Sequence, residues 1–448
     1  MALTGIQIFK HLPKTNCGDC GVPTCLAFAM SLAAGKAELA KCPHVSAEGK
    51  AALTEASAPP IRTVEIGPHQ DAFKVGGETV LFRHEKTFVN KPGLAVQITD
   101  TQSEAEVAGR LARFTELSYT RVGMQLKGEL IAIRSTTGDR DRFMRLVAQA
   151  KDVPGARLIL ITEDPELLAA GAAELKGARP LLYAATPRNV EAVGKVAREA
   201  GCPVVAKADS LDALAALTEK LNGLGIQDIV LDSGARGLRQ AMHDQVHIRR
   251  LALLKKMRAL GYPTIALPCE MTDDPLKEAL YASAFIAKYA GIIVLSDFQG
   301  ETLFPLLLER LNIYTDPQRP MVAEPKTYSF GAVDERSPLL VTCNFALTHF
   351  IVSGEIEASR IPAYLLVVDT EGLSVMTAWA AGKFAGDLVG VAIKKSGFAE
   401  QSKSRTVVLP GLAAMISGDL EAEIGEGWKV LIGPREAANI TPFLKQIA

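Results

Sequence analysis

The sequence Asn16-Cys17-Gly18-Asp19-Cys20-Gly21-Val22-Pro23-Thr24-Cys25, with Cys42-Pro43 after it, decides how the first part of the chain folds. Four of the seven cysteines fall here, in the spacing C-x2-C-x4-C-x16-C. Iron–sulfur clusters are held by cysteine thiolates, commonly three on one loop and a more distant one followed by proline. Gly18 and Gly21 allow the loop to wrap closely and to point N–H groups at an anionic cluster. The stretch therefore predicts a four-iron four-sulfur cluster with the ligands Cys17, Cys20, Cys25 and Cys42.

A structural zinc site is the main alternative for these cysteines. Zinc sites usually pair their cysteines at short spacing in each half of the site, whereas Cys25 and Cys42 each stand alone. A helix is predicted over residues 26–39 and would bring Cys42 back toward the loop. A disulfide framework fits less well, because the chain is long and starts without the pattern of a secretory signal.

Length and composition limit the remaining possibilities. A chain of 448 residues predicts about three domains, and 48% hydrophobic with 22% charged residues predicts a globular protein. The net charge of -1 gives no broad field for nucleic acid or for an anionic membrane, and charged residues interrupt every apolar run that could cross a bilayer. Single thiols at Cys202, Cys269 and Cys343 are expected to be small buried hydrophobic residues. An oxygen-sensitive cluster and free thiols suit a reducing cytoplasm.

The first 91 residues divide at a proline pair. We expect residues 1–58 to form the cluster module, and residues 59–91 to form a linker and hairpin that begins with the stiff Pro59-Pro60. Two strands are predicted in the hairpin, at residues 62–66 and 79–88, around a turn at residues 75–78. This region is expected to be a spacer outside any core.

Residues 92–325 alternate short apolar runs with amphipathic helical runs. The eight predicted strands cover residues 94–99, 130–134, 158–162, 180–185, 204–207, 228–231, 264–267 and 292–295. Eight β-α repeats predict a (β/α)8 TIM barrel, with a doubly wound sheet as the alternative. The strand ends that would carry any chemistry hold Asp100, Arg134, Glu163, Asp209, Asp232, Glu270 and Asp297. We expect these side chains to cap helices and to form ion pairs, and His243 and His247 to lie on a solvated helix face.

Residues 326–448 predict a small flavodoxin-like (Rossmann-like) α/β domain. Its predicted strands cover residues 339–342, 364–369, 388–393, 406–409 and 429–432. Ligands of such sheets bind outside the carboxyl ends of the strands, at the point where the strand order reverses. The candidate loops are therefore residues 342–344, 368–374 and 432–435. These loops contain neither G-x-G-x-x-G nor G-x-x-x-x-G-K-[ST], so the sequence gives no sign of nucleotide binding.

The cysteine stretch and the three-part layout together resemble the large (gamma) subunit of the corrinoid iron–sulfur protein of the acetyl-CoA (Wood–Ljungdahl) pathway. The match is strongest at residues 12–29 and at Cys42-Pro43, and it extends over the whole chain. The resemblance implies that the four cysteines bind the cluster and that a cobalamin-type corrinoid lies against the C-terminal domain. It also implies the corrinoid contacts Leu340, Thr342, Ala346, Thr370, Glu371, Gly372, Leu373, Ser374 and Gly433.

The resemblance implies a methyl carrier in place of an enzyme with catalytic residues of its own. The cobalt would accept methyl from methyltetrahydrofolate through a methyltransferase and deliver it to acetyl-CoA synthase/CO dehydrogenase, while the cluster returns cobalt(II) to cobalt(I). The implied partners also include a small subunit that completes a heterodimer and a low-potential donor such as ferredoxin. Neither nucleic acid nor a membrane is expected as a partner.

The lower face of the cobalt is expected to lack a histidine ligand. Many corrinoid domains supply one from a D-x-H-x-x-G loop, but this motif is missing, and the only C-terminal histidine is His349. Two other functions remain open: a corrinoid-free electron-transfer subunit with a scaffold barrel, and a folate-binding methyltransferase that uses the barrel.

Overall fold

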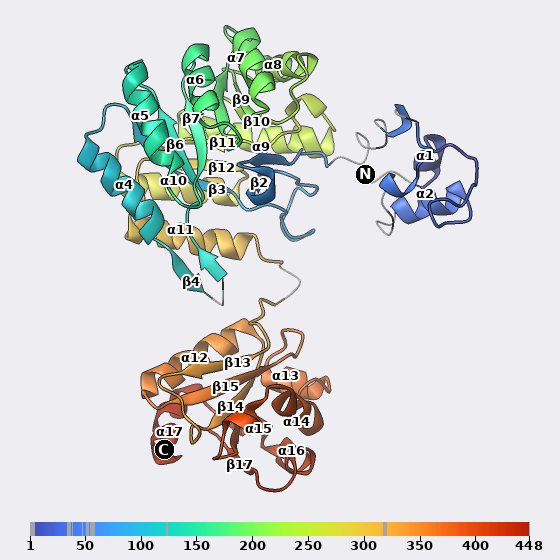
Figure 1. Ribbon diagram of the computed structural model, residues 1–448, viewed down its shortest axis with the longest axis vertical. Coiled ribbons are helices and arrows are strands. Elements are labelled where there is room, and N and C mark those ends of the chain that lie inside the picture. Colours follow the sequence, from blue (N-terminus) through green and yellow to red (C-terminus); the bar gives the residue numbers. More distant parts are fainter. Residues whose placement is uncertain are drawn as a thin grey trace. The chain divides into compact units, whose positions relative to one another are not determined.

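The computed structural model describes residues 5–33, 37, 39–46, 48–50, 53, 59–121, 124–316 and 320–447 (Figure 1). The chain divides into two compact units. The first comprises Met1–Leu81, Val89–Leu111 and Glu129–Asp297, and the second comprises Phe82–Phe88, Ala112–Gly128 and Phe298–Ala448. Within the described residues, no helix combines the length and the apolar character needed to span a membrane.

The first unit begins with a small helical module. Helices α1 (Gly5–Lys10) and α2 (Cys25–Ala33) pack on each other, and a short helix, η1 (Leu39–Lys41), precedes Cys42. The small core of this module contains Ile8, Leu12, Phe28, Ala29 and Leu53. The helix predicted over residues 26–39 is confirmed in its first part. Its second part lies largely outside the described residues.

Eight parallel strands form the centre of the first unit, in the order β10-β9-β8-β7-β6-β3-β12-β11. A parallel bridge between Leu231 and Thr264 joins the two ends of this order, and the Leu231 N–H donates to the carbonyl of Pro263 at 2.8 Å. The sheet therefore closes into the predicted (β/α)8 barrel, and the doubly wound alternative is wrong for this region. The strands are β3 (Gly93–Thr99), β6 (Leu130–Arg134), β7 (Arg157–Ile161), β8 (Leu181–Ala185), β9 (Val204–Lys207), β10 (Ile229–Asp232), β11 (Ile265–Ala266) and β12 (Ile292–Leu295).

A helix follows each barrel strand along the chain. These helices are α4 (Glu104–Glu116), α5 (Arg140–Lys151), α6 (Pro165–Glu174), α7 (Val190–Ala200), α8 (Leu211–Gly223), α9 (Leu238–Leu254), α10 (Pro275–Ala287) and α11 (Gly300–Ile313), with η3 (Arg258–Leu260) and η4 (Pro268–Glu270) on either side of β11. Asp164 and Ser210 cap α6 and α8 by accepting from the backbone N–H groups of Glu166 and Ala213. Asp232 caps no helix, because α9 starts only at Leu238.

The region expected to be a spacer is part of the barrel core. Strands β1 (Val64–Ile66) and β2 (Phe73–Val75) pair antiparallel around a short helix, η2 (His69–Asp71). Their side chains Val64, Ile66 and Val75 are fully buried among the inward-facing residues of the barrel strands. The predicted strand at residues 79–88 is wrong, since no strand forms there. In the second unit, a hairpin of β4 (Tyr119–Arg121) and β5 (Met124–Leu126) was not predicted.

The C-terminal part of the second unit is a five-stranded sheet with the order β13-β15-β14-β16-β17. The strands are β13 (Thr327–Phe330), β14 (Leu339–Cys343), β15 (Ala363–Val368), β16 (Thr406–Leu409) and β17 (Lys429–Ile432). All pairings are parallel except that of the edge strand β13. Without β13, the order of the strands along the sheet is that of a flavodoxin-like fold, and it reverses between β14 and β16. Two residue pairs, Leu339 with Val407 and Leu340 with Val408, join these two strands.

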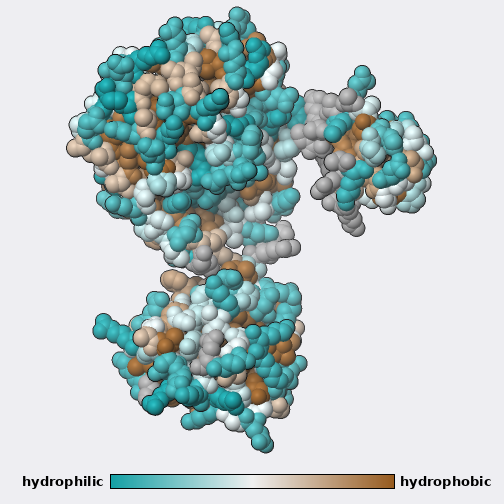
Figure 2. Space-filling model, viewed as in Figure 1, coloured by the Kyte–Doolittle hydropathy of each residue, from teal (hydrophilic) through white to brown (hydrophobic). Residues whose placement is uncertain are grey.

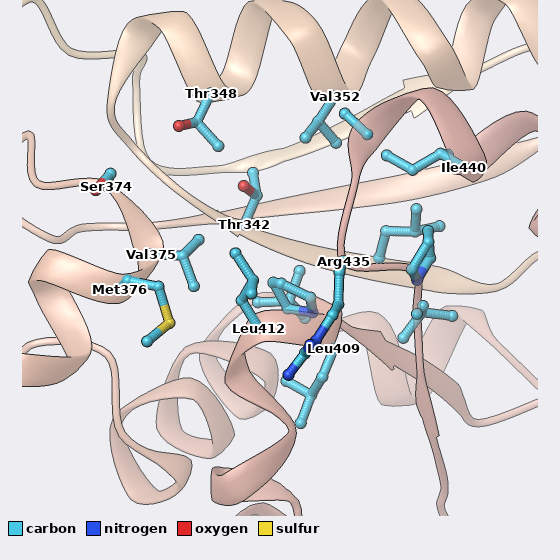
Figure 3. A pocket seen from close by; sticks show the side chains of 17 residues that line it. Thr342, Thr348, Val352, Ser374, Val375, Met376, Leu409, Leu412, Arg435 and Ile440 are labelled. Carbon is cyan, nitrogen blue, oxygen red and sulfur yellow. The ribbon is translucent and has the colours of Figure 1, made fainter.

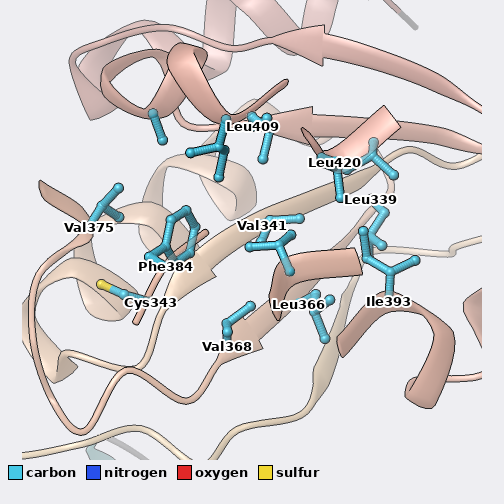
Figure 4. Close-up of a cluster of buried hydrophobic side chains, with 14 of the residues drawn as sticks. Leu339, Val341, Cys343, Leu366, Val368, Val375, Phe384, Ile393, Leu409 and Leu420 are labelled. Carbon is cyan, nitrogen blue, oxygen red and sulfur yellow. The ribbon is translucent and has the colours of Figure 1, made fainter. Parts of the chain in front are cut away.

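Helices cover both faces of this sheet. On one face, α12 (Ala346–Ser359) and α17 (Ile440–Ile447) enclose Leu340, Leu365 and Val408. On the other face, Leu339, Val341, Leu366 and Leu409 belong to the larger core shown in Figure 4. The elements on that second face are α13 (Val375–Ala380), α14 (Gly386–Lys395), α15 (Phe398–Gln401), η5 (Gly411–Ile416) and α16 (Ser417–Ile424), and η6 (Ala437–Asn439) precedes α17.

The strand predicted at residues 388–393 is wrong, because these residues lie in α14. The buried positions Gly386, Val389, Gly390 and Ile393 follow the i, i+3, i+4, i+7 spacing of a helix face. A Cβ atom added at Gly390 would lie 2.4 Å from Cγ of Glu423, so the glycine allows α14 and α16 to pack closely. The unbroken apolar run in the sequence concealed this spacing.

Candidate metal centre and ligand pocket

The four predicted ligand cysteines lie around the small core of the N-terminal module. Cys25 starts α2 and is buried, whereas Cys20 and Cys42 are half-buried beside the same core. Cys17 is exposed. All four are free thiols, as ligation by thiolates requires.

The loop between Cys17 and Cys25 has the backbone that a wrapped cluster loop requires. Gly18 and Gly21 have φ angles of 80° and 79°, with open space where a Cβ would stand, and the Gly21 N–H donates to the Gly18 carbonyl at 2.8 Å. The Asn16 side chain accepts from the Cys25 N–H at 2.8 Å and so fixes the far end of the loop. Sequence reasoning gave Asn16 no role, because it precedes the cysteine spacing.

The segment after Cys42 returns to this loop. His44 Nε2 lies 2.6 Å from Asp19 Oδ2, and these two side chains form a close group with the Cys17 thiol. The hydrogen bonds from His44 and then from Cys17 lower the pKa of Asp19. The contact brings the regions of the first and the last predicted ligands together. Among the described residues, the close group of potential metal ligands is Cys17, Asp19 and His44, and the structure does not bring Cys20, Cys25 and Cys42 into it. Four cysteine thiols nevertheless have the donor type that an iron–sulfur cluster requires.

The C-terminal domain contains a cavity of about 240 Å³ where the strand order reverses, between β14 and β16. Its walls are mainly apolar, and Figure 3 shows side chains from α12, α13, β16 and α17 directed into it. The lining residues are Leu340, Val341, Thr342, Thr348, Val352, Ser374, Val375, Met376, Val408, Leu409, Pro410, Leu412, Gly433, Pro434, Arg435, Ala437 and Ile440. Such a site suits a ligand with a large apolar surface.

Four of the nine predicted contact residues line this cavity: Leu340, Thr342, Ser374 and Gly433. The other five lie beside it. Ala346 is buried at the start of α12, and Thr370 is fully buried behind the loop that ends at Ser374. Glu371 pairs with Lys383, Gly372 packs on Val322, and the partly buried Leu373 packs against the larger core of the domain.

The cavity also takes residues that sequence reasoning did not select. Thr348 and Val352 are one helical turn apart on α12, and Met376 and Leu412 come from two further segments. Arg435 adds a cationic side chain (Figure 3). Only the i, i+4 spacing on α12 was a signal in the sequence, since the other residues meet through the folded sheet.

His349 is absent from the residues that line the cavity. Its ring packs on Tyr328 of β13, with the ring centroids 4.8 Å apart, and burial lowers its pKa.

The polar residues at the barrel strand ends mostly bond to one another. Tyr183 donates to Asp232 at 2.6 Å and accepts from Arg236 at 2.9 Å, and Arg236 bridges Asp232 and Glu270. Burial and then Asp232 raise the pKa of Tyr183 well above its usual value. Arg134 also pairs with Glu270. The remaining pairs and bonds join Glu163 to Lys207 and Arg188, and Asp100 to Ser135, Thr136 and Thr137.

The two histidines of α9 and the three single cysteines form no common site. His243 and His247 are exposed on α9, with ring centroids 6.1 Å apart, which confirms the solvated face. Cys202 and Cys343 are buried as predicted, and burial raises the pKa of Cys202 to about 11. Cys269 is only partly buried. Hydrophilic residues predominate on the face shown in Figure 2, with hydrophobic ones scattered among them.

Comparison with known proteins gives matches along the whole chain. A family model described as the CO dehydrogenase/acetyl-CoA synthase delta subunit matches residues 63–444, and one described as a putative Fe-S cluster matches residues 12–44. The corrinoid/iron-sulfur protein large subunit of Moorella thermoacetica is 44% identical, over 99% of each chain. The acetyl-CoA decarbonylase/synthase complex subunit gamma of Methanothermobacter thermautotrophicus is 34% identical, over 100% of each chain.

Among solved structures, the dihydropteroate synthase of Yersinia pestis has a TM-score of 0.36 and 17% sequence identity, covering 52% of this chain and 100% of that one. This likeness carries no functional argument.

Proposed function

The chain belongs to the family of corrinoid/iron-sulfur protein large subunits and acetyl-CoA decarbonylase/synthase gamma subunits, and we propose that it carries a methyl group on a bound corrinoid. The observation that carries the proposal is that one chain has both a loop with four free cysteines and an apolar cavity at the switch point of a flavodoxin-like sheet. Each feature suits one cofactor of the relatives' printed names, an iron–sulfur cluster and a corrinoid.

We assign the cluster to Cys17, Cys20, Cys25 and Cys42. The positive φ angles of Gly18 and Gly21 open the loop around the ligands, and the Asn16 side chain holds the Cys25 N–H. The role of these residues is to hold a low-potential electron donor in a reducing environment.

We assign the corrinoid to the C-terminal domain, with Leu340, Thr342, Ser374 and Gly433 at the cavity and Ala346, Thr370, Glu371, Gly372 and Leu373 around it. When bound, the corrinoid supplies a cobalt that accepts and releases a methyl group, and the cluster supplies the electron that restores reduced cobalt. The apolar and hydroxyl side chains at the cavity, among them Leu340, Thr342 and Ser374, would hold the corrinoid without a histidine ligand to its cobalt. The position of His349 outside the cavity supports this assignment.

The proposal includes partners that approach the C-terminal domain. Trp379, Leu412 and Met415 are exposed on α13 and η5, two neighbouring elements at the cavity rim. Exposed apolar side chains at a rim suit coverage by another protein, and the name of the Moorella relative implies a small subunit. We further propose a methyltetrahydrofolate methyltransferase, acetyl-CoA synthase/CO dehydrogenase and a ferredoxin-like donor as transient partners in the cytoplasm.

The proposed division of labour follows the predicted domain boundaries. Residues 1–58 would bind the cluster, 59–91 would link and seal the barrel, 92–325 would form the barrel scaffold, and 326–448 would bind the corrinoid. The backbone bonds of Met321 and Ala323 to the β14–α12 connection support a start of the last domain slightly before residue 326.

Anaerobic purification of the full chain with its small partner subunit tests the proposal. We expect a coloured protein that contains about four iron atoms and one cobalt atom per chain, with corrinoid absorption. Iron without cobalt would support the corrinoid-free electron-transfer alternative. Zinc in place of iron would overturn the cluster assignment.

A further inference from the structure

The side chain of Asn344 lies at the carboxyl end of β14, one residue after the strand, and is buried. Its Oδ1 atom accepts from the backbone N–H of Thr370 at 3.0 Å and from the backbone N–H of Gly372 at 2.9 Å. The Thr370 hydroxyl lies 2.8 Å from the same oxygen. One amide oxygen therefore gathers three donors from a loop that is distant in sequence.

The amide nitrogen of Asn344 completes the arrangement. It donates to Asp369 Oδ1 at 2.9 Å, and the same carboxylate oxygen accepts from the Glu371 N–H at 3.0 Å. The loop has a strained backbone, because Glu371 has a φ of 55° and Gly372 a φ of 79°. Hydrogen bonds to Asn344 hold this left-handed turn in place.

The same residue also fixes the segment by which the chain enters the domain. The Asn344 carbonyl accepts from the Ala323 N–H at 2.8 Å. A Cβ added at Gly372 would lie 2.9 Å from Val322 Cγ1, so the loop rests directly on this entering segment. Asn344 thus joins three segments: the end of β14, residues 321–323 and the loop at residues 369–373.

We propose that Asn344 is a positioning residue that presets the loop at residues 370–374 against the corrinoid, an inference that rests on the proposed function. The loop leads to Ser374 and Val375, which line the cavity. The side chain of Asn344 itself does not line the cavity, so it acts through the loop. A loop that is ordered before the ligand arrives binds more tightly, because its conformational entropy has already been lost.

The test uses the full chain with its small partner subunit and the variants Asn344→Leu, Asn344→Asp and Asn439→Leu. Leucine has a similar size and removes every side-chain hydrogen bond. Aspartate keeps the acceptor oxygen and loses the donor to Asp369. Asn439 is exposed on η6 and does not line the cavity, so its substitution is the matched control.

Two measurements separate positioning from a general loss of structure. Hydrogen exchange of the corrinoid-free protein reports on the amides of residues 370–373, and absorbance titration with hydroxocobalamin reports on affinity. We expect Asn344→Leu to speed exchange of this loop and to weaken binding by at least about tenfold. Asn344→Asp should weaken binding less, and Asn439→Leu should change neither quantity.

The possible results decide the proposal in each case. Wild-type exchange or wild-type affinity in Asn344→Leu would overturn it. If Asn344→Leu fails to fold, Thr370→Val provides the decision, because it removes the hydroxyl that lies 2.8 Å from both Asn344 Oδ1 and the Leu373 carbonyl; unchanged affinity and exchange in that variant would overturn the proposal. If the wild-type protein does not bind hydroxocobalamin, the proposed function fails, and the exchange data still show whether Asn344 sets the loop.

Discussion

The barrel and the C-terminal domain both end their parallel strands at an edge where ligands usually bind, but the two edges differ in chemistry. At the barrel edge, Tyr183, Asp232, Arg236 and Glu270 bond to one another, and the pocket of about 390 Å³ beside them has many polar lining residues, among them Asp209, Gln240 and His247. At the other edge, mainly apolar side chains enclose a cavity of about 240 Å³. The difference teaches that the chemistry of the lining, more than the position of an edge or its free volume, decides which ligand a site suits.

The largest expected effect comes from breaking the charged network of the barrel. Arg236→Met leaves Asp232 and Glu270 close together without their shared cation, and the free energy of unfolding should fall by about 3–5 kcal/mol. Urea unfolding measures the loss, and hydroxocobalamin affinity of the folded protein should stay at the wild-type value. A loss of affinity without a loss of stability would show that the barrel edge is itself a binding site.

Blocking the cavity should have the next largest effect. Ser374→Trp places a large ring at the cavity wall. The Ser374 side chain caps no backbone N–H of α13, and the change removes only its hydrogen bond with the Thr377 hydroxyl at 3.0 Å. We expect hydroxocobalamin affinity to fall by about 100-fold, which corresponds to about 2.7 kcal/mol. Asp209→Asn, an exposed change at the barrel edge, is the control and should leave affinity unchanged. Equal effects of the two variants would remove the distinction between the edges.

Removing the charge of Asp100 should have a smaller effect on stability. This carboxylate accepts its hydrogen bonds from neighbouring residues at the barrel edge. Burial alone would raise the pKa of Asp100, but the N–H groups of Thr137 and Thr136 hold this pKa below its usual value. A lowered pKa in the folded state adds stability that is present above the unfolded pKa of about 3.9 and is lost as the pH falls further. Asp100→Asn should therefore cost about 1–3 kcal/mol at pH 7 and less near pH 3. A cost that is independent of pH would contradict this assignment.

The smallest effect is expected from Glu278. Its contribution to stability depends on pH in the opposite direction to that of Asp100. Burial raises the pKa of Glu278, against the lowering effect of the hydrogen bonds from Ser296. A raised pKa adds stability that is present below the unfolded pKa of about 4.3 and is lost as the pH rises through the folded value. Glu278→Gln removes this titration, so the wild type should lose stability relative to the variant as the pH rises above about 4.3, by less than about 1 kcal/mol. Thermal unfolding of both proteins at pH values below and above about 4.3 measures the difference in their stability.

Much of the fold could be predicted because the barrel strands are buried on both faces. Their apolar runs are short and bounded by helix caps, as at Asp164 and Ser210, so the eight strands were found at nearly their true positions. The closure of the barrel depends on the contact of Leu231 with Thr264, and no local pattern encodes it. Reading apolar runs as strands also produced the wrong strand at residues 388–393. These residues form part of α14, where close packing at Gly390 favours a helix.

The candidate sites also contain some features that follow from local sequence patterns and others that form only in the folded chain. The cysteine spacing is local, so the sequence alone predicts a set of four ligands, Cys17, Cys20, Cys25 and Cys42. Asn344 lies in one of the predicted candidate loops, but its hydrogen bonds could not be predicted, because its partners Thr370 and Gly372 stand 26 and 28 residues away and meet it only in the folded sheet. The cavity residues come from several separate segments, and the hairpin β1–β2 looked like a spacer because its burial depends on the barrel that follows.

The short pairing between β14 and β16 has a consequence for ligand size. Two residue pairs join these strands, whereas five join β14 to β15 and four join β16 to β17. Beyond Leu340 and Val408 the two backbones diverge without bonds that would have to break. We therefore expect the distance between the ends of β14 and β16 to adapt to ligands of different thickness. The hydrophobic layers on both sides of the sheet would keep their packing.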